Sequence, residues 1–410
     1  MAGEQTQLDW GKEAGLGGRI APRGALRNMA QERHSFGDTR QMDFSQPFFT
    51  EQLITYIGNK RRLLPFINDG VEKVKQELGR DKLTCLDGFA GSGAVSRLLK
   101  YHADFLCSND LESYAYIVNK CYLTNQRDID VFRLQKTIDW LNSTARAKLT
   151  AGFIYENYAP KDDGDIQNGE RVFYTGYNAK MLDTLKGLIY SAIRAEERHL
   201  YLAPLIVAAS VNANTSGVFK GFHKKDGRGH FGGRGEHALS RIKKPIDLKT
   251  PIFGDAECGI RVSQKDINDL VMEDFEYDLA YYDPPYNQHP YGSNYFMLNI
   301  LATRRPEVPI QDGVSGIVRE WNRSAYNKRA PAIRAMNDLM KNTRAKYILI
   351  SYNNEGIIPF DTFREILSNY GRVSLMEQDY NTYRGCRNLS GRNMKVKELL
   401  WLVRKGGKNV

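Results

Sequence analysis

The chain has 410 residues, 41% of them hydrophobic, and this length can bury a large core in one domain with insertions or in two domains. No apolar run approaches the roughly 20 residues of a membrane-spanning helix, and the N-terminus has no signal-peptide core. The five cysteines lack the paired spacing of a metal site, which favours free thiols in a reducing cytoplasm. The formal net charge of +10 favours a polyanionic partner.

The folded part of the chain is expected to begin near Phe48. Residues 1–47 are rich in Gly, Gln, Arg and Ala without hydrophobic periodicity, so we expect a mobile, solvated tail. A helical pattern then follows the run Tyr-Ile-Gly-Asn-Lys at 56–60, because apolar residues recur on one face from 63 to 74.

A strand, a glycine-rich turn and a helix come next in the chain. The strand 82–87 ends on Asp87, the turn 88–93 is Gly-Phe-Ala-Gly-Ser-Gly, and the helix is expected over 94–101. Such a turn lets a ligand approach the backbone, and the helix N-terminus supplies free amides, which is typical of a nucleotide-binding α/β unit.

An acid follows this turn at the spacing of a ribose ligand. The second strand, 105–110, ends on Asp110, which is placed to bind the two hydroxyls of an adenosine ribose. The turn lacks the third glycine of dinucleotide binders, which disfavours NAD. An unrelated α/β turn is the alternative.

Residues 111–255 are predicted to be an insertion, because they are too long for a single crossover helix. Helices are expected at 114–122, 131–147, 178–195 and 200–211. Residues 212–250 alternate glycines with basic, aromatic and histidine residues. We expect this stretch to bury little and to present cations to a nucleic acid on a flexible backbone. A disordered basic loop is the alternative, and the absence of nearby cysteines disfavours a metal site at the histidines.

The strand 277–282 runs directly into Asp-Pro-Pro-Tyr at 283–286. Two prolines end a ladder of hydrogen bonds, so a carboxylate, two backbone carbonyls and an aromatic ring are expected at the mouth of a sheet. These groups can hold a nucleobase by its exocyclic amine and stack on its ring. An ordinary strand-to-loop stop is the alternative.

Strands and helices alternate through the remainder of the chain. Expected strands lie at 260–262, 346–352, 373–378 and 398–403, and expected helices at 296–302, 331–342 and 360–368. This alternation predicts an α/β fold with a doubly wound, mostly parallel sheet and an antiparallel last strand, interrupted by the helical and loop insertion.

The motifs, taken in order, resemble those of the DNA adenine N6-methyltransferases of the Dam type, the α-ordered group. They are Tyr-Ile-Gly-Asn-Lys, Phe-Ala-Gly-Ser-Gly, a strand-end Asn-Asp, Lys-Asp-Ile at 265–267 and Asp-Pro-Pro-Tyr. Within that group the chain is similar to the methylases of type IIS restriction systems. The resemblance covers about residues 50–405 and implies a Rossmann-like class I fold that uses S-adenosylmethionine.

The resemblance also implies roles for individual residues. Tyr56 and Lys60 are implied to contact the methionine part of S-adenosylmethionine, Asp110 its ribose and Asp266 its adenine. The full implied set of cofactor-binding residues is Tyr56, Lys60, Asp87, Phe89, Gly91, Gly93, Asp110 and Asp266. The implied catalytic residues are Asp283, Pro284, Pro285 and Tyr286.

The implied chemistry is direct transfer to the amine of a flipped-out adenine. Asp283 and the Pro284 carbonyl accept the two N–H bonds of this weak nucleophile, while Tyr286 stacks on the base. A C5-cytosine methylase would need a nucleophilic cysteine, usually after a proline, and no cysteine in this chain follows one. Transfer to cytosine N4, an RNA adenine substrate and an inactive nucleic-acid-binding relic stay open as alternatives.

The implied partner is double-stranded DNA, bound by a cytoplasmic bacterial or phage monomer without metal, either alone or beside a cognate restriction endonuclease. Residues 48–110 and 256–410 are expected to form the catalytic domain and 111–255 the target-recognition region. The candidate DNA-binding residues are Lys220, Lys224, Lys225, Arg228, Arg234, Arg241, Lys243, Arg384, Arg387 and Arg392.

Overall fold

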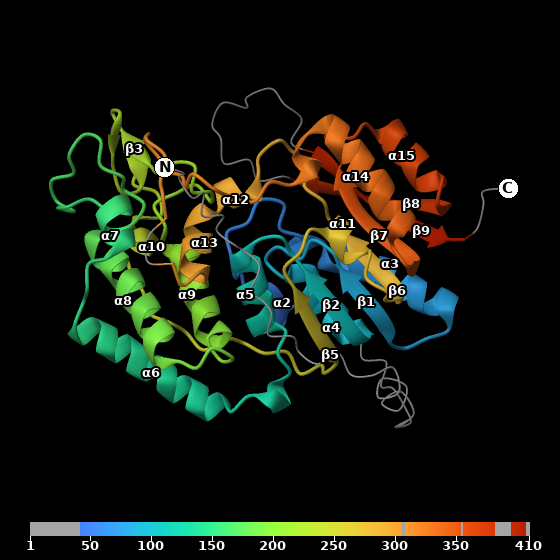
Figure 1. The fold of residues 1–410 in the computed structure, drawn as a ribbon, viewed down its shortest axis with the longest axis horizontal. Helices are drawn as coiled ribbons and strands as arrows, with labels where there is room; N and C mark the ends of the chain where they lie inside the picture. Colours follow the sequence, from blue (N-terminus) through green and yellow to red (C-terminus); the bar gives the residue numbers. More distant parts are fainter. Residues whose placement is uncertain (1–41, 306–307, 354–355, 382–394, 407–410) are drawn as a thin grey trace, which may run out of the picture. The chain divides into compact units, whose positions relative to one another are not determined.

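A computed structural model describes residues 42–305, 308–353, 356–381 and 395–406. The chain from Asp43 onward forms one compact unit around a seven-stranded sheet (Figure 1). Its strands are β1 (Leu83–Asp87), β2 (Ala103–Asn109), β5 (Gly259–Ser263), β6 (Tyr277–Tyr282), β7 (Ala345–Asn353), β8 (Gly371–Asn381) and β9 (Lys395–Lys405). Within these described ranges, no helix combines the length and the apolar character needed to cross a membrane.

The strands lie in the order β5-β2-β1-β6-β7-β9-β8. Neighbours from β5 to β7 pair in parallel, whereas β9 is antiparallel to both β7 and β8. The predicted doubly wound sheet with an antiparallel last strand is therefore confirmed. The last strand enters between β7 and β8, so that β8 forms the edge of the sheet.

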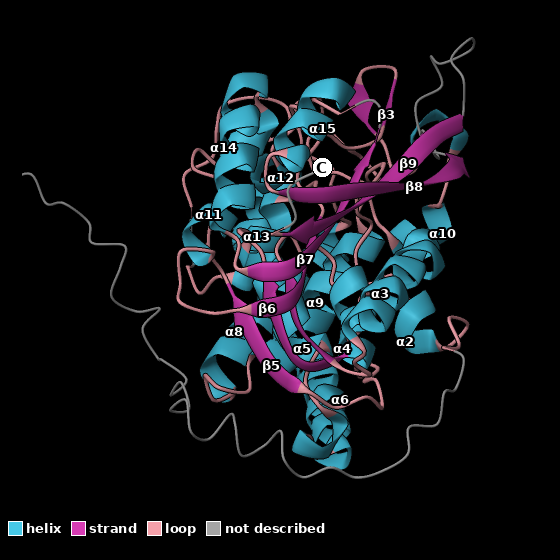
Figure 2. Ribbon diagram, turned by 90° about the vertical axis from the view of Figure 1, so that its right-hand side faces the viewer, coloured by secondary structure: helices cyan, strands magenta, loops and turns pink. Residues whose placement is uncertain are grey.

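Two groups of helices cover the two faces of the sheet (Figure 2). These helices are α3 (Leu64–Leu78) and α4 (Ala94–His102) on one face, and α11 (Ile267–Leu270), α14 (Arg329–Asn342) and α15 (Phe360–Ser368) on the other. On the first face α3 packs closely because residue 70 is glycine. A Cβ there would lie 3.1 Å from the side chains of Leu349 on β7 and Leu400 on β9.

A second apolar core lies beside the sheet, in a block of helices (green in Figure 1). The helices of residues 111–255 are α5 (Ser113–Tyr122), α6 (Val131–Ala147), α7 (Phe153–Tyr158), α8 (Gly176–Ala192), α9 (His199–Asn212) and α10 (Leu239–Lys243). Helix α13 (Phe296–Ala302) packs into the same core although it follows β6. The ammonium of Lys186 on α8 donates to the carbonyl of Ile300, at 2.7 Å, which ties the block to the segment that follows the Asp-Pro-Pro-Tyr motif.

The expectation that residues 212–250 bury little is wrong. Phe219, Phe222 and Phe231 are buried in the helical core, and a short antiparallel hairpin, β3 (Lys224–Lys225) and β4 (Arg228–Gly229), projects from it. The glycines serve close packing here, since a Cβ at Gly229 would lie 2.4 Å from the side chain of Val172. The three phenylalanines of this stretch therefore face the core, whereas most of its cations face solvent.

Asn214 holds this stretch in place. Its Nδ2 donates to the carbonyls of Val172 and His230, at 2.8 and 3.2 Å, and its Oδ1 accepts from Gly232 N at 2.9 Å. One buried amide thus satisfies three backbone groups of an irregular segment, which is how such a segment can be buried at all.

The other predicted helices occur within a few residues of their expected ends, whereas several short elements were not predicted. The short helices are α2 (Pro47–Thr50) and α12 (Tyr291–Asn294), together with α7, α10 and α11. Elements of this length carry too few turns for a hydrophobic period to be visible in the sequence.

Candidate active site

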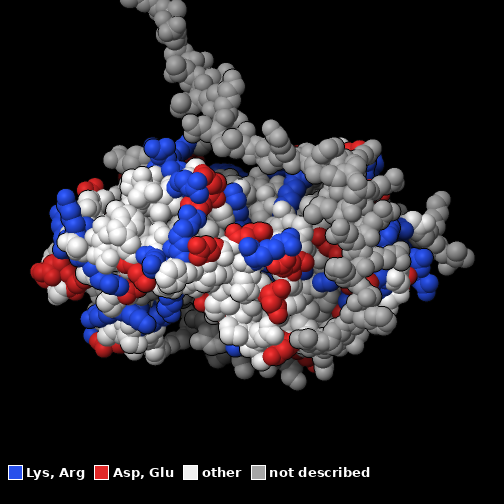
Figure 3. All heavy atoms as spheres, turned by 90° about the horizontal axis from the view of Figure 1, so that it is seen from below, with Lys and Arg blue, Asp and Glu red and all other residues white. Residues whose placement is uncertain are grey.

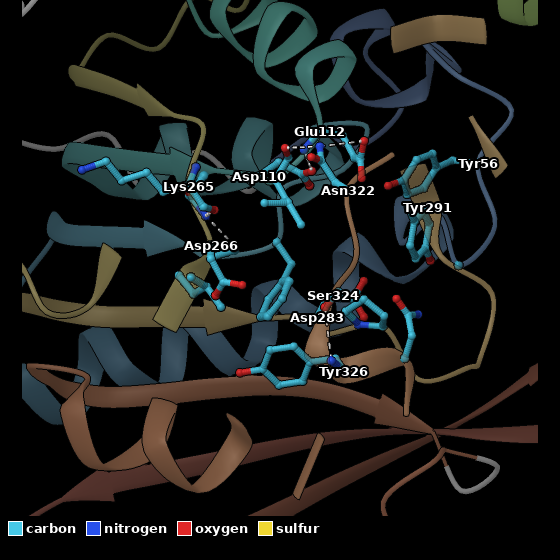
Figure 4. Close-up of a pocket in the computed structure, with 18 of the residues that line it drawn as sticks. Tyr56, Asp110, Glu112, Lys265, Asp266, Asp283, Tyr291, Asn322, Ser324 and Tyr326 are labelled. Carbon is cyan, nitrogen blue, oxygen red and sulfur yellow. Dashed lines mark hydrogen bonds between the residues drawn. The ribbon is translucent and has the colours of Figure 1, made fainter. Parts of the chain in front are cut away.

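Four acids lie at the carboxyl ends of four parallel strands. Asp87 ends β1, Asp110 follows β2, Asp266 follows β5 and Asp283 follows β6. Carboxyl ends of parallel strands share one edge of a sheet, and ligands bind there where the strand order reverses, which in this sheet is between β1 and β6. Figure 4 shows Asp110, Asp266 and Asp283 around one pocket.

Two adjoining pockets open at this edge. The large pocket encloses about 700 Å³, including its part open to solvent, and its lining includes Tyr56, Phe89, Asp110, Asp266, Asp283 and Pro285. The small pocket encloses about 300 Å³, and its lining includes Lys60, Asp87 and Gly91. Both are lined by Asp283. Three predicted residues, Gly93, Pro284 and Tyr286, lie beside the pockets and are not among the residues that line them.

The glycine turn is shaped by contacts that a side chain would prevent. Gly91 and Gly93 have φ angles of 51° and 78°, in the left-handed region. A Cβ on Gly91 would lie 2.9 Å from the ring of Tyr56, and one on Gly93 would lie 2.5 Å from Asn119 Oδ1. The turn therefore brings its backbone directly against Tyr56 at the boundary of the two pockets.

Asp110 is fixed by backbone donors on both carboxylate oxygens. Gly91 N donates to Oδ2 at 2.7 Å and Glu112 N donates to Oδ1 at 2.9 Å. Burial raises the pKa of Asp110 to about 6, and the backbone donors oppose this rise. Near neutral pH the group is a carboxylate with fixed orientation, suited to accept hydrogen bonds from ligand hydroxyls.

Asp87 is the most completely buried of the four acids. Ser96 Oγ donates to its Oδ2 at 2.6 Å, while its Oδ1 is buried without a hydrogen-bond partner among the described residues. Burial raises the pKa of Asp87 to about 7, and the charge of Asp283 adds to the rise. An unpartnered buried carboxylate oxygen beside the small pocket has the chemistry to accept a hydrogen bond from a ligand cation.

Asp283 belongs to a buried cluster with Lys60 and Glu398. Lys60 Nζ lies 2.9 Å from Asp283 Oδ1 and 3.5 Å from Glu398 Oε1. Burial raises the pKa of Asp283 to about 6, although the nearby ammonium lowers it and the second carboxylate raises it. Burial alone would lower the pKa of Lys60, but the two carboxylates hold it well above its usual value. Glu398 was given no role from the sequence. The feature that could have identified it is that it is the one acidic residue in the otherwise apolar predicted strand 398–403.

Aromatic rings surround this cluster. Tyr286 lies beside Lys60, with Nζ 5.5 Å from its ring centroid, and glycine at 58 makes room for its hydroxyl, which would lie 2.6 Å from a Cβ there. Tyr56 stacks on Tyr291 and Tyr295, with ring centroids 5.0 and 4.9 Å apart. The sequence analysis did not identify Tyr291, which also lines the large pocket.

The segment before α14 supplies pocket residues that the sequence analysis also did not identify. Asn322 Nδ2 donates to the carbonyl of Leu111 at 3.0 Å and lies 3.3 Å from Glu112 Oε2. Tyr326 donates to Asn268 Oδ1 at 2.9 Å, and its ring packs edge-on against Phe89. The sequence signal for these residues was a polar and aromatic run between β6 and β7. Because the chain leaves β6 at its carboxyl end, the segment that follows this strand starts at the carboxyl edge of the sheet.

The candidate DNA-binding residues divide into three groups. Exposed residues are Lys224, Lys225, Arg228, Arg234 and Lys243, with Lys220 partly buried. Arg241 points inward and donates to the carbonyls of Val211 and Ala213 at the end of α9. Arg384, Arg387 and Arg392 lie outside the described residues. The face in Figure 3 carries basic and acidic side chains side by side, so charge alone does not mark that face as a DNA surface.

Fold and site together define a Rossmann-like methyltransferase with an Asp-Pro-Pro-Tyr motif beside its ligand pockets. Residues 56–366 match the family of D12 class N6 adenine-specific DNA methyltransferases, so the chain belongs to this family. The predicted family and activity, an adenine-specific DNA methyltransferase, are confirmed. Within the described residues, no group of three or more His, Cys, Asp or Glu could hold a metal ion.

The chain is similar to methyltransferases of restriction–modification systems. It is 29% identical over 349 residues to the type II methyltransferase M.NlaIII of Neisseria lactamica, covering 84% of this chain and 96% of that protein. It is 26% identical to M.CviAII of Paramecium bursaria Chlorella virus 1, covering 85% and 98%. It is 28% identical to the modification methylase StsI of Streptococcus sanguinis, covering 85% of this chain and 52% of that protein.

Proposed function

We propose that this protein uses S-adenosylmethionine to methylate the N6 amine of an adenine that is turned out of duplex DNA. The observation that carries the proposal is the position of Asp283, which lines both pockets and directly follows β6, the strand next to β1. One carboxylate can therefore meet a ligand in the strand-edge pockets and a base that enters from the DNA side.

The residues of the two pockets fit S-adenosylmethionine. The buried, unpartnered Oδ1 of Asp87 suits the ammonium of its methionine part, and the backbone-fixed carboxylate of Asp110 suits its ribose hydroxyls. Asp266 lines the large pocket, where it suits the amino group of the adenine ring. When bound, this cofactor supplies a methyl group on a positively charged sulfur.

The base-holding groups are proposed to be those of the motif at 283–286. Asp283 and the Pro284 carbonyl accept the two N–H bonds of the adenine amine, and Tyr286 stacks on its ring. The proximity of Lys60 keeps the Asp283 carboxylate ionised and in place. Because the Asp283 side chain is only 18% exposed, an adenine within an intact duplex cannot reach it, and the base must leave the stack.

Residues 111–255 are proposed to form the target-recognition region. The support is the β3–β4 hairpin, which presents Lys224, Lys225 and Arg228 to solvent from a buried aromatic base. A rigid support of this kind places cations at phosphates without the ordering cost of a flexible loop.

Replacing Lys224 and Lys225 together with Ala should weaken DNA binding by a similar factor for specific and non-specific duplexes. The slope of log K against log salt concentration should fall by about 2, because each lost phosphate contact removes about 0.9 from it. Fluorescence anisotropy over a salt series measures this slope. The double variant of the exposed Lys73 on α3 and Lys341 on α14 is the matched control, and an equal slope change in both would refute the hairpin assignment.

The proposed function is tested by incubating the protein with duplex DNA and S-adenosylmethionine labelled in its methyl group. Digestion to nucleosides should place the label in N6-methyladenine. Label in N4-methylcytosine, or transfer to RNA in preference to duplex DNA, would contradict the proposal. Sequencing of DNA from cells that express the protein would give the methylated site. Because the relatives are restriction–modification methylases, an endonuclease that cleaves the same site is the proposed partner.

A further inference from the structure

The Lys60 ammonium is surrounded by three protein oxygen atoms. Besides Asp283 Oδ1 at 2.9 Å and Glu398 Oε1 at 3.5 Å, the carbonyl of Gly58 accepts from it at 3.2 Å. The Gly58 carbonyl accepts a hydrogen bond from the ammonium, and the two carboxylates are its ion-pair partners. The lysine side chain is 5% exposed, and those of Asp283 and Glu398 are 18% and 10% exposed. The cluster is therefore largely removed from water.

The charges of this cluster do not balance. Two carboxylates share one ammonium, so an excess negative charge is kept in a largely buried site. Such an excess opposes folding, because burying a charge without a partner is costly. An ion pair between Lys60 and Asp283 alone would have left no excess charge in this buried cluster. The second carboxylate comes from β9, the strand inserted between β7 and β8, so the tertiary fold places it there.

Resting on the proposed function, we propose that Glu398 is a positioning residue that acts through Lys60. By sharing the ammonium, it prevents Lys60 from neutralising Asp283 fully, so that Asp283 stays a strong acceptor for the adenine amine and takes up the proton that the amine loses. Glu398 itself is not among the residues that line either pocket.

The proton and the electron pairs balance in this scheme. The amine nitrogen uses its lone pair to form the bond to the methyl carbon, while the carbon–sulfur bond breaks and sulfur keeps that pair. The nitrogen is then positively charged and releases one N–H proton. The Asp283 carboxylate accepts that proton, becomes neutral, and returns it to water after the product leaves. No further reactant is needed.

Several titratable groups besides Lys60 and Glu398 face Asp283, and any charge on them also affects the Asp283 pKa. They are Tyr281 on β6, Tyr286 in the same loop, Tyr291 on α12 and Asp87 at the end of β1. Tyr281 and Tyr291 are neutral at the pH of the reaction, since burial raises the pKa of each well above its usual value. Asp87 adds negative charge, and it is unchanged when only Glu398 is altered.

The test is the pH dependence of single-turnover methylation by Glu398→Gln, which removes the charge but keeps the shape. In the wild-type protein the rate should fall as pH drops through about 6, because burial raises the Asp283 pKa to about 6 and the protonated carboxyl is a poor acceptor. In Glu398→Gln the ammonium pairs with Asp283 alone. We expect the acid limb to move down by about 1 pH unit and the rate at pH 8 to fall about tenfold.

The matched control is Glu377→Gln on the neighbouring strand β8, where the carboxylate pairs with Lys397 at the surface. It should keep the wild-type rate and acid limb. Calorimetry should give the same affinity for S-adenosylmethionine in all three proteins. Glu398→Asp, which keeps the charge with a shorter reach, should move the limb in the same direction by less. An unchanged limb in whichever Glu398 variant folds would overturn the proposal.

A readout without cofactor or DNA is the melting temperature between pH 5 and 8. The pKa of Asp283 is higher in the folded protein, at about 6, than in the unfolded chain. This carboxyl group therefore stabilises the folded state at pH values below its unfolded pKa, and the stabilisation is lost as pH rises through about 6. Glu398→Gln should make the increase in the Asp283 pKa smaller, so this variant should lose less stability between pH 5 and 8 than the wild type. An equal loss in both proteins would count against the proposal. Absence of methylation by the wild-type protein would instead refute the proposed function itself.

Discussion

Asp283→Ala is expected to lower the single-turnover rate of adenine methylation by at least about 10³-fold. The variant loses the carboxylate that is proposed to accept the amine N–H and to receive its proton, and both effects would operate in a largely buried site where electrostatic interactions are strong. Affinity for S-adenosylmethionine should change little, because Asp87 and Asp110 are untouched. Rapid-quench measurement of labelled N6-methyladenine gives the rate.

The fold should survive this substitution. Lys60 keeps Glu398 as a partner and the carbonyl of Gly58 as an acceptor, so no unpaired buried charge is created. The control is Asp361→Ala at the exposed start of α15, which should methylate at the wild-type rate. A folded Asp283→Ala protein that retains more than about a tenth of the wild-type rate would show that the carboxylate is not the essential acceptor.

Asp110→Ala is expected to weaken the binding of S-adenosylmethionine about 100-fold, which is about 2.7 kcal/mol. The substitution removes the carboxylate proposed for the ribose hydroxyls and leaves Gly91 N without its acceptor at 2.7 Å. Isothermal titration calorimetry measures the affinity. At saturating cofactor, the methylation rate should stay within a few-fold of wild type, because the role proposed for Asp110 is to hold the ribose and not to contact the reacting amine.

Asp104→Ala is the matched control for this prediction. Asp104 lies near the start of β2, the strand that Asp110 follows, and it is exposed. Its replacement should leave cofactor affinity unchanged. Wild-type affinity in Asp110→Ala would mean that the acid after β2 does not hold the ribose, and that the ligand lies differently in the large pocket.

Much of the catalytic half could be predicted because its signals are local. A buried strand followed by a glycine turn, and a strand that ends on Asp-Pro-Pro-Tyr, each lie within about ten residues. Parallel strands then bring their carboxyl ends to one edge, so the approximate meeting of Asp110, Asp266 and Asp283 follows from the strand assignments alone.

Residues 212–250 differ from what their local sequence predicts. Glycine and charge predicted an unburied segment, yet the aromatic residues enter a core built by helices that precede and follow this stretch. Arg241 was grouped with DNA-binding residues by its charge, whereas its guanidinium binds carbonyls at the end of α9. Composition reports how polar a segment is, but it does not report which neighbours are available to satisfy its polar groups.

The sequence by itself determined the doubly wound architecture, the order of the motifs and the family, because each depends on residues close together in the chain. The tertiary structure decided that β9 enters between β7 and β8, and hence that Glu398 reaches Lys60 and Asp283. It also decided that Asn322 and Tyr326 line the large pocket. The physical reason is that strand insertion and pocket closure depend on pairing between distant segments, which hydrophobic periodicity does not record.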